Sequence, residues 1–282
     1  MTILRTPSQM RQRALRLRRW GKRIGVVPTM GALHEGHLSL IRRARRDNDV
    51  VIVTIFVNPL QFGPREDFAN YPRPFARDVR LSRAAGAGII FAPRAQDLYP
   101  RGFQTQIEPG PLAARWEGKA RPGHFRGVAT VVAMLCELTQ PTNAYFGQKD
   151  YQQALIIRRM IRDLHLPVRM HLCPIIREPD GLAMSSRNVH LSATQRRQAA
   201  VLSQALRIAK QRIRAGERRV AVIERLMRRH IRSATEARLE YAAIVDADML
   251  EPQRRLAGRC AILLAVRVGR TRLIDNLLVA VS

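Results

Sequence analysis

The stretch Pro28-Thr29-Met30-Gly31-Ala32-Leu33-His34-Glu35-Gly36-His37 decides how the beginning of the chain folds. The apolar run Ile24–Val27 precedes it, and the amphipathic segment Leu38–Ala44 follows it. This order predicts a strand, a tight glycine-containing turn and a helix. His34 and His37 are three residues apart, so they would share one face of the first helical turn. Because a helix N-terminus presents unpaired N–H groups and a partial positive charge, the turn predicts an anion site beside two imidazoles.

The alternation of strands and helices continues downstream. Helices are expected at 8–20, 75–85, 128–138 and 151–164, and strands at 50–57, 88–93, 143–147 and 167–174. Strands that alternate with helices predict an α/β fold with a Rossmann-like, doubly wound parallel sheet. Ligands of such sheets bind outside the carboxyl ends of the strands. The opening turn, the loop Asn58–Gly63 and the turn Gly147–Asp150 are therefore expected to meet at one edge.

The pattern changes at about residue 176. Two basic helices are expected at 194–215 and 220–234, and three strands at 241–245, 261–268 and 273–281. Because helices and strands no longer alternate, we expect a first domain over 1–175 and a second, smaller α+β domain over 176–282.

The net charge of +27 would ordinarily indicate a nucleic-acid-binding protein. The basic residues are, however, spread along the chain and are nearly all arginine, the lysines being Lys22, Lys119, Lys149 and Lys210. No helix-turn-helix, zinc-finger or RNA-recognition pattern is found. We therefore expect no specific nucleic-acid partner, and only weak, nonspecific binding to polyanions at low salt.

Two further features concern location. No apolar run approaches the length of a membrane-spanning helix, and residues 1–5 lack the apolar core of a signal peptide. The expected location is the cytoplasm, with no membrane partner.

Cys136, Cys173 and Cys260 are far apart, which favours buried thiols over a disulfide framework or a zinc cluster.

Two motifs carry candidate chemistry. The imidazoles of His34 and His37 could stabilise charge that builds on a phosphorus centre. They could also cap the helix or ligate a metal, although the helical HExxH spacing is absent. The loop Met184–Asn188 offers two hydroxyls, backbone N–H groups and a guanidinium that could clasp a polyphosphate, but it could equally be a plain turn.

The two motifs together resemble the nucleotidylyltransferase superfamily, in which an HxGH turn and a Met-Ser-Ser loop bind ATP. A fuller set of motifs resembles the pantothenate synthetase family in order and spacing over nearly the whole chain. That set consists of Pro28–His37, Val57–Phe62, Tyr71–Arg73, Gly123–Thr130, Phe146–Gln153 and Leu182–Asn188.

The resemblance implies an enzyme that joins pantoate to β-alanine at the expense of ATP. The pantoate carboxylate would first become a pantoyl adenylate with release of pyrophosphate, and β-alanine would then displace AMP. The family is typically a homodimer that uses Mg²⁺. By resemblance, the domain over 1–175 would bind nucleotide and pantoate, and the domain over 176–282 would close over the ATP site.

The resemblance also assigns roles to single residues. His37 would be the principal catalytic residue, His34 would assist, and Lys149 would contact phosphate. Gln61, Gln153 and Asn58 would bind the pantoate and β-alanine side of the site. The ATP-binding residues would be Met30, Gly31, Ala32, Leu33, His34, Glu35, Gly36, His37, Gly147, Gln148, Lys149, Asp150, Ile176, Met184, Ser185, Ser186 and Arg187.

Some positions depart from the family. Gln148 and Met134 stand where a glutamate and a lysine are frequent, and Arg77-Asp78 stands where two acidic residues are common. The metal ligands are therefore left unassigned. Another nucleotidyl transferase of the same fold, or a nucleic-acid-binding protein, remain the alternatives. The first would not need the Gln61 and Gln153 pair, and the second is favoured by charge alone.

Overall fold

The computed structural model describes residues 1–64 and 66–281. By their contacts, these residues form two compact units. The first, unit 1, comprises Met1–Gln148 and Gln152–Pro174; the second, unit 2, comprises Lys149–Tyr151 and the chain from Ile175 onward. The separate binding tasks expected of domains 1–175 and 176–282 stay predictions.

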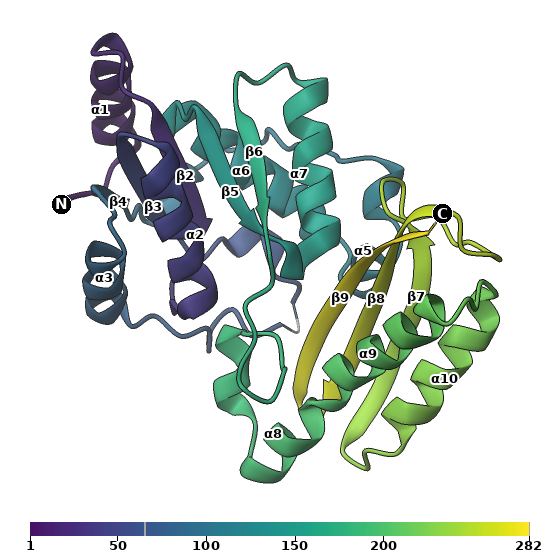
Figure 1. The fold of residues 1–282 in the computed structure, drawn as a ribbon. Coiled ribbons are helices and arrows are strands. Elements are labelled where there is room, and N and C mark those ends of the chain that lie inside the picture. Colours follow the sequence, from purple (N-terminus) through teal and green to yellow (C-terminus); the bar gives the residue numbers. More distant parts are fainter. Residues whose placement is uncertain (65, 282) are drawn as a thin grey trace. The chain divides into compact units, whose positions relative to one another are not determined.

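Unit 1 is built on a six-stranded sheet in which every pairing is parallel. The strand order is β1-β4-β3-β2-β5-β6 (Figure 1). The strands are β1 (Thr2–Leu4), β2 (Ile24–Thr29), β3 (Val50–Ile55), β4 (Ile89–Phe91), β5 (Asn143–Gly147) and β6 (Arg169–Cys173). The predicted α/β class is thereby confirmed, whereas the short edge strand β1 was not predicted.

Helices cover both faces of this sheet. The long ones are α1 (Pro7–Arg19), α2 (Glu35–Asp47), α3 (Phe75–Ala84), α6 (His124–Thr139) and α7 (Tyr151–Asp163). Residues of α1, α6 and α7 share one apolar core with Val26 and Ile52, and residues of α2 share another with Val27 and Val51. Neighbouring strand residues thus point into opposite cores, as a sheet buried on both faces requires.

Shorter helical segments lie in the loops of unit 1 and at its boundary. They are the α-helices α4 (Ala95–Leu98) and α5 (Glu117–Ala120) and the 3₁₀ segments η1 (Pro59–Gln61), η2 (Pro111–Ala113) and η3 (Gln148–Asp150). The helix expected at 128–138 begins earlier, at His124, directly after Gly123, whose φ is +80°.

The strand order fixes where a ligand can bind. From β2 the chain continues outward to β3 and β4 on one side, and it then returns to β5 and β6 on the other side. The order therefore reverses between β2 and β5, and ligands of open α/β sheets bind at the carboxyl ends of the strands at such a switch point. The ends of β2 and β5 are Thr29 and Gly147, which are the places where the predicted nucleotide motifs begin.

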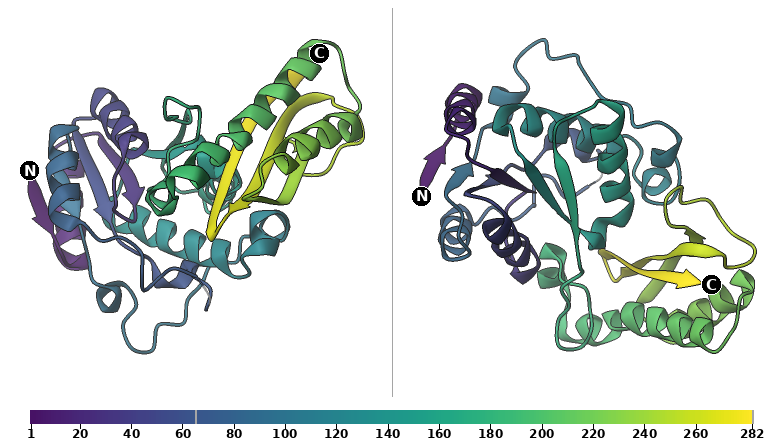
Figure 2. Two further views of the ribbon diagram at one scale, coloured as in Figure 1. Left: turned by 90° about the horizontal axis from the view of Figure 1, so that it is seen from below. Right: turned by 45° about the horizontal axis from the view of Figure 1, so that its top comes forward.

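Unit 2 contains an antiparallel sheet of three strands in the order β7-β8-β9. The strands are β7 (Ala237–Asp246), β8 (Gly258–Val268) and β9 (Thr271–Val281). The helices are α8 (Ala193–Ala199), α9 (Val201–Arg214) and α10 (Val220–Arg232), with the 3₁₀ segment η4 (Ser186–His190) before them. Helices α9 and α10 pack on one face of this sheet in a single apolar core (Figure 2).

The prediction of a single helix at 194–215 is wrong in one respect. It is interrupted at Ala200, which separates α8 from α9. The Ser203 hydroxyl donates a hydrogen bond of 3.0 Å to the Ala200 carbonyl. Such side-chain bonds to a helix carbonyl compete with the regular ladder and often bend a helix, which periodicity alone does not reveal.

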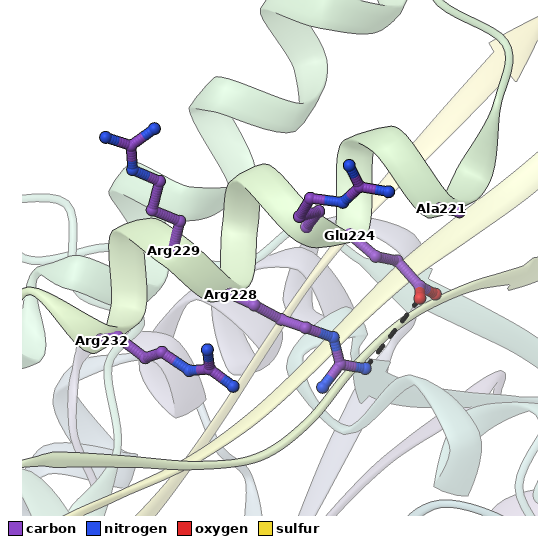
Figure 3. A pocket seen from close by; sticks show the side chains of 6 residues that line it. Ala221, Glu224, Arg228, Arg229 and Arg232 are labelled. Carbon is purple, nitrogen blue, oxygen red and sulfur yellow. Dashed lines mark ion pairs between the residues drawn. The ribbon is translucent and has the colours of Figure 1, made fainter.

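Helix α10 supports the open edge of β7. The Glu224 carboxylate accepts the Ile244 N–H at 3.1 Å, and Arg228 donates to the Ala242 carbonyl at 2.9 Å. Glu224 and Arg228 also form an ion pair at 4.0 Å (Figure 3). These side chains, together with the backbone of residues 251–253 that pairs with Ile244–Asp246, therefore cover this edge, which limits pairing with another chain.

In the part of the chain that the structure describes, no helix combines the length and the apolar character that crossing a membrane requires.

Candidate active site at the carboxyl edge of the parallel sheet

The turn after β2 has a backbone that few sequences can adopt. Gly31 has φ +84° and Ala32 has φ +50°, so two successive residues are left-handed. A Cβ added to Gly31 would lie 2.9 Å from Asp78 Oδ2 and 3.2 Å from Ile55 Cγ2. Glycine is therefore required at position 31, both for its φ and for space. The Thr29 hydroxyl accepts the Gly31 N–H at 3.1 Å and donates to the Thr54 carbonyl at 2.6 Å.

Asp78 holds this turn from α3. Its Oδ2 and Oδ1 atoms accept the N–H groups of Ala32 and Leu33, each at 2.8 Å. The Asp78 side chain is almost fully buried, and this burial raises its pKa while the two N–H donors oppose the rise. Both oxygens thus accept backbone hydrogen bonds. Sequence reasoning missed this role, although Asp78 is the acidic residue in the first turn of α3.

The two histidines cap helix α2. His34 Nδ1 accepts the Gly36 N–H at 3.1 Å, and His37 Nδ1 accepts the His34 N–H at 3.3 Å. The ring centroids are 4.1 Å apart. Because both Nδ1 atoms accept, the proton of each neutral ring must lie on Nε2. Capping, one of the alternatives for these residues, is therefore real, and it uses Nδ1 of each ring as the acceptor.

A second loop, after β3, joins the turn through side chains. Gln61 Nε2 donates to the Met30 sulfur at 3.3 Å, and its Oε1 accepts from Asn58 Nδ2 at 3.1 Å. Asn58 Oδ1 caps η1 by accepting the Leu60 N–H at 3.3 Å and also accepts from the Tyr99 hydroxyl at 2.7 Å. Three predicted site residues, Met30, Asn58 and Gln61, are thus brought together by hydrogen bonds.

The backbone of Gln61 is held by the first residue of α6 and by the loop that precedes this helix. The Gln61 carbonyl accepts from His124 Nδ1 at 2.8 Å and from Arg121 Nη2 at 3.3 Å. Arg121 also pairs with Glu66 through contacts of 2.8 and 2.5 Å. Burial, reinforced by the Arg121 charge, lowers the pKa of His124 to about 4, so the ring is neutral at pH 7. With Nδ1 donating, His124 Nε2 is free to accept from Arg121 Nη1 at 3.0 Å.

Helix α6 approaches η1 closely. A Cβ added to Gly127 would lie 2.3 Å from the Leu60 carbonyl oxygen and 2.6 Å from the Gln61 nitrogen. The Gly127 carbonyl accepts from Asn58 Nδ2 at 3.0 Å. Only glycine allows this contact, so position 127 sets the distance of α6 from the Gln61 loop.

The remaining predicted residues of unit 1 follow β5. Gly147 ends that strand, Gln148 begins η3, and Gln153 lies in the first turn of α7. The preceding glutamine, Gln152, has a structural role. Its side-chain amide donates to the carbonyls of Leu112 and Arg115, each at 2.9 Å, and accepts the Glu117 N–H at 3.0 Å. The amide of Gln61 is engaged by Asn58 and Met30, so the predicted pairing of Gln61 with Gln153 around a substrate stays a prediction.

The other predicted residues belong to unit 2. Lys149 Nζ lies 3.8 Å from Asp150 Oδ1, and the Lys149 carbonyl accepts from Asn276 at 2.9 Å. The Met184 N–H donates to the Ile176 carbonyl at 3.0 Å, so these two predicted residues adjoin. Ser185 Oγ accepts the Arg187 N–H at 3.3 Å at the start of η4, which also contains Ser186.

The loop that carries these unit 2 residues is fixed by a buried ion pair. Arg177 contacts both Asp275 oxygens, at 2.7 and 2.9 Å, and the Asp275 side chain is fully buried. Such bidentate pairs fix the direction of both side chains. The residues after Ile176 are therefore anchored to β9.

Within the described residues, no group of three or more His, Cys, Asp or Glu side chains could hold a metal ion. The metal-ligation alternative for His34 and His37 gains no support, and Asp78 already serves the turn. The described part of the chain thus offers no dedicated metal cage in this region.

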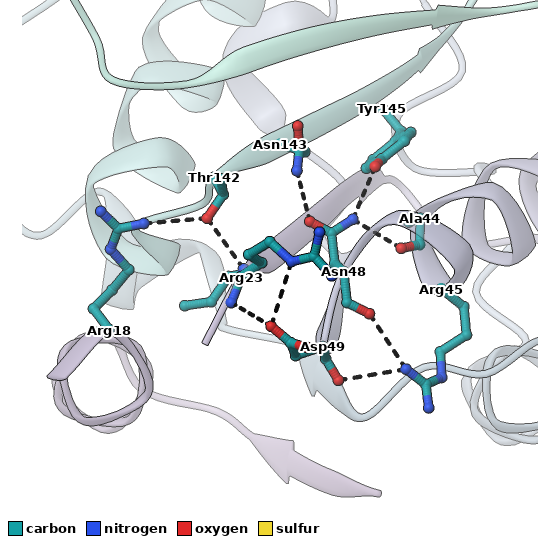
Figure 4. A network of polar contacts seen from close by, with 10 residues as sticks. Arg18, Arg23, Ala44, Arg45, Asn48, Asp49, Thr142, Asn143 and Tyr145 are labelled. Carbon is teal, nitrogen blue, oxygen red and sulfur yellow. Dashed lines mark hydrogen bonds and ion pairs between the residues drawn. The ribbon is translucent and has the colours of Figure 1, made fainter. Parts of the chain in front are cut away.

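The opposite end of α2 is tethered to the sheet by a buried polar network around Asn48 (Figure 4). Asn48 Nδ2 donates to the Ala44 carbonyl and to the Tyr145 hydroxyl, each at 2.8 Å, and Asn48 Oδ1 accepts from Asn143 at 2.7 Å. Tyr145 and Asn143 belong to β5, and the Tyr145 hydroxyl donates to Asp47 at 3.0 Å. The helix that begins with the histidines is thereby fixed to the strand that ends at Gly147.

These features define the class of the protein. A doubly wound parallel sheet, with a histidine-capped helix starting at the end of β2 beside its switch point, is a Rossmann-like nucleotide-binding arrangement.

The comparisons with known proteins identify the family. Residues 2–278 match the family described as pantoate-beta-alanine ligase. A curated pantothenate synthetase of Moorella thermoacetica is 52% identical over 282 residues and covers 100% of both chains, and that of Roseiflexus castenholzii is 56% identical over 253 residues, or 90% and 91% of the two chains. The chain belongs to the pantoate-beta-alanine ligase family, which confirms the resemblance.

Solved structures agree. Pantothenate synthetase from Thermus thermophilus superposes with a TM-score of 0.94 at 47% identity, covering 98% of this chain and 99% of that one. The pantoate-beta-alanine ligase from Francisella tularensis, determined in complex with beta-gamma ATP and beta-alanine, gives a TM-score of 0.81 at 37% identity, covering 99% and 97%.

Neutral His124 makes stability depend on pH. Its folded pKa of about 4 lies below the unfolded value of 6.5, so between those values the unfolded chain binds more protons. We expect unit 1 of the wild-type protein to lose about 3 kcal/mol more stability than His124→Asn on going from pH 7 to pH 4. Asn keeps a donor near the position of Nδ1. Urea unfolding followed by tryptophan fluorescence measures unit 1, because Trp20 and Trp116 both lie in it.

The matched control is His165→Asn, because His165 is exposed. That variant should keep the pH dependence of the wild-type protein. Identical pH dependence in the wild-type protein and in His124→Asn would contradict the role of the buried neutral ring.

Proposed function

We propose that this chain catalyses the ATP-dependent condensation of pantoate with β-alanine to pantothenate, releasing AMP and pyrophosphate. The observation that carries the proposal is the membership of the whole chain in the pantoate-beta-alanine ligase family. The histidine-capped start of α2 beside the buried Gln61 amide, at the carboxyl edge of the sheet, provides donors for both a phosphate and a carboxylate.

The chemistry requires two steps because a carboxylate is a poor acyl donor. In the first step, a pantoate carboxylate oxygen forms a bond to the α-phosphorus of ATP, and the bond from that phosphorus to the bridging oxygen of pyrophosphate breaks. In the second step, the β-alanine amine attacks the acyl carbon of pantoyl adenylate and loses a proton. The acyl–oxygen bond breaks, and AMP leaves with its electron pair.

His37 is assigned to the first step. The transition state places additional negative charge on the α-phosphate oxygens, and fixed donors aimed at such charge lower the barrier. His37 Nδ1 is occupied by the His34 N–H, so its Nε2–H is the donor that the ring can present. His34, held in the same tautomer by Gly36, supplies a second donor of the same kind. Because both rings act as neutral donors, no protonated imidazole is needed.

Gln61 is assigned to pantoate. One proton of its amide group is directed at a thioether sulfur, which is a weak acceptor. A substrate carboxylate or hydroxyl oxygen is a better acceptor and could take this amide without leaving a strongly bonded partner unpaired. Asn58 fixes the other end of the amide, and His124 with Arg121 fixes the backbone. Gln153 is assigned to pantoate by resemblance.

The remaining residue assignments concern the binding of ATP. By resemblance, Met30–His37 and Gly147–Asp150 contact the nucleotide, together with Ile176 and Met184–Arg187. In this chain Lys149 would contact phosphate. Mg²⁺ would enter with the ATP phosphates, since such ions usually keep several waters and one or two protein ligands, and no step is assigned to it. The homodimer and the cytoplasmic location are further parts of the proposal.

The activity is tested by the order of product release. Enzyme, ATP and Mg²⁺ should yield pyrophosphate on addition of pantoate, and AMP should be released into solution when β-alanine follows. AMP release without β-alanine, or equal turnover with unrelated carboxylates such as acetate and lactate, would contradict the proposed reaction. Both products are resolved by ion-exchange chromatography of quenched samples.

The role of His37 is tested by two substitutions. His37→Ala should lower the rate of pantoate-dependent ATP–pyrophosphate exchange by about two orders of magnitude, as loss of a preorganised donor does. His37→Gln should retain part of this rate, because its amide can still donate. The exposed His165→Ala is the matched control and should exchange normally. Near-normal exchange by His37→Ala would remove His37 from the first step.

The role of Gln61 is tested by binding. Gln61→Ala should weaken pantoate binding by about tenfold or more, which corresponds to about 1.4 kcal/mol, while ATP affinity is kept. Isothermal titration with each ligand separates the two effects. Gln140→Ala is the control, because the Gln140 side-chain amide donates to the carbonyl and the carboxylate of Glu137, in the last turn of α6. Loss of ATP affinity with unchanged pantoate affinity would contradict the assignment.

A further inference from the structure

The surface of α10 carries a groove to which the proposed ligase reaction assigns no residue. The groove has a volume of about 580 Å³ and lies wholly on unit 2. Its lining consists of Ala221, Glu224, Arg225, Arg228, Arg229 and Arg232. None of these residues belongs to the candidate active site, so the groove calls for a separate account.

The arginines lie on both sides of this groove. Arg229 extends away from Arg228 and Arg232 in Figure 3. Arg225 is four residues before Arg229 and therefore lies on the same side of the helix, and Arg228 is likewise four residues before Arg232. At a rise of 1.5 Å per residue, each pair repeats a guanidinium about every 6 Å along the helix axis. The groove is thus flanked by two short rows of cations.

Most of this positive charge is not neutralised by the protein. Glu224 is the carboxylate of the lining, and it is already held by Arg228 and by the Ile244 N–H. Within residues 1–64 and 66–281, no carboxylate forms an ion pair with Arg225, Arg229 or Arg232. The core packing of α10 depends on its opposite face, which carries Val220, Ile223, Met227 and Ile231. Arg225, Arg229 and Arg232 can therefore contact a ligand without loss of core packing, whereas Arg228 is engaged by Glu224 and Ala242.

We propose that this groove binds single-stranded nucleic acid through its phosphodiester backbone, without reading sequence. A linear chain with one negative charge per nucleotide matches cations that repeat along both sides of a helix. Guanidinium planes also provide stacking surfaces for unpaired bases. Among the described residues, neither an aromatic side chain nor an amide lines the groove, so the lining that the structure describes provides no stacking platform for a particular base and no amide donor for its edge. The net charge of +27 increases the rate of encounter with any such polyanion.

The test uses three substitutions in the groove, Arg225→Gln, Arg229→Gln and Arg232→Gln, made together. Gln removes charge and keeps helix propensity. A fluorescein-labelled RNA of about 16 nucleotides, without self-complementarity, is titrated by fluorescence anisotropy at several salt concentrations. We expect affinity at low salt to fall by about tenfold or more and the slope of log affinity against log salt to decrease by about two, since each phosphate contact with a single strand contributes about 0.7.

The matched control removes the same charge elsewhere. Arg16→Gln, Arg19→Gln and Arg46→Gln, made together on α1 and α2, also lower the net charge by three at exposed positions. This control should bind the RNA within about twofold of the wild-type protein if the groove is the site. Circular dichroism and ligase activity check that both triple variants remain folded.

Three outcomes would overturn the proposal. Equal losses in the two triple variants would show binding spread over the basic surface. Equal displacement of the RNA by duplex, by inorganic polyphosphate or by polyglutamate at matched charge would show a generic polyanion surface. Retention of full affinity by the groove variant would place the binding site elsewhere.

Discussion

The carboxylate of Asp78 is the constraint on which the geometry of the candidate site depends. It accepts the two N–H groups that the left-handed turn at Gly31 and Ala32 directs toward α3. Without that acceptor, two buried N–H groups would lack partners, and each such group costs about 1–3 kcal/mol. The backbone geometry of this turn determines where α2 begins, and therefore where His34 and His37 lie. A chain this rich in arginine therefore uses one buried carboxylate to organise a region that must receive anions.

The loop that carries Gln61 is also held by side chains that bond to its backbone, but here the side chains are hydrogen-bond donors. Its backbone is held by neutral His124, and Arg121 is directed by Glu66. The loop that carries the candidate residue Gln61 is thus positioned through contacts to its main-chain carbonyl. Preorganisation of this kind is required for catalysis by fixed dipoles, because donors that must reorient during the reaction lose much of their advantage.

The elements of the sheet could be predicted from sequence because apolar runs such as Val50–Val57 have few alternative structures. Local pattern also located the histidine turn, and the motifs located Gln61. Pattern could not predict that Asp78 would reach Ala32 and Leu33, because these contacts join residues 46 and 45 positions apart. The three-residue strand β1 was also missed, since it is held by pairing with β4 and by packing of Leu4 against the core, and both contacts are long-range. What sequence reasoning lacked in each case was a long-range contact rather than a local preference.

The buried position of Asn48 depends on an absent side chain in β2. A Cβ at Gly25 would lie 2.6 Å from Asn48 Nδ2, so the space that Asn48 fills exists only because residue 25 has none. Positions 25 and 48 are therefore coupled: a larger residue at 25 is compatible only with a smaller one at 48. In a family of related chains, this coupling should appear as covariation between β2 and the far end of α2, the helix that His34 and His37 cap. It would link substitutions about one helix length away from the histidines to the permitted orientation of those histidines.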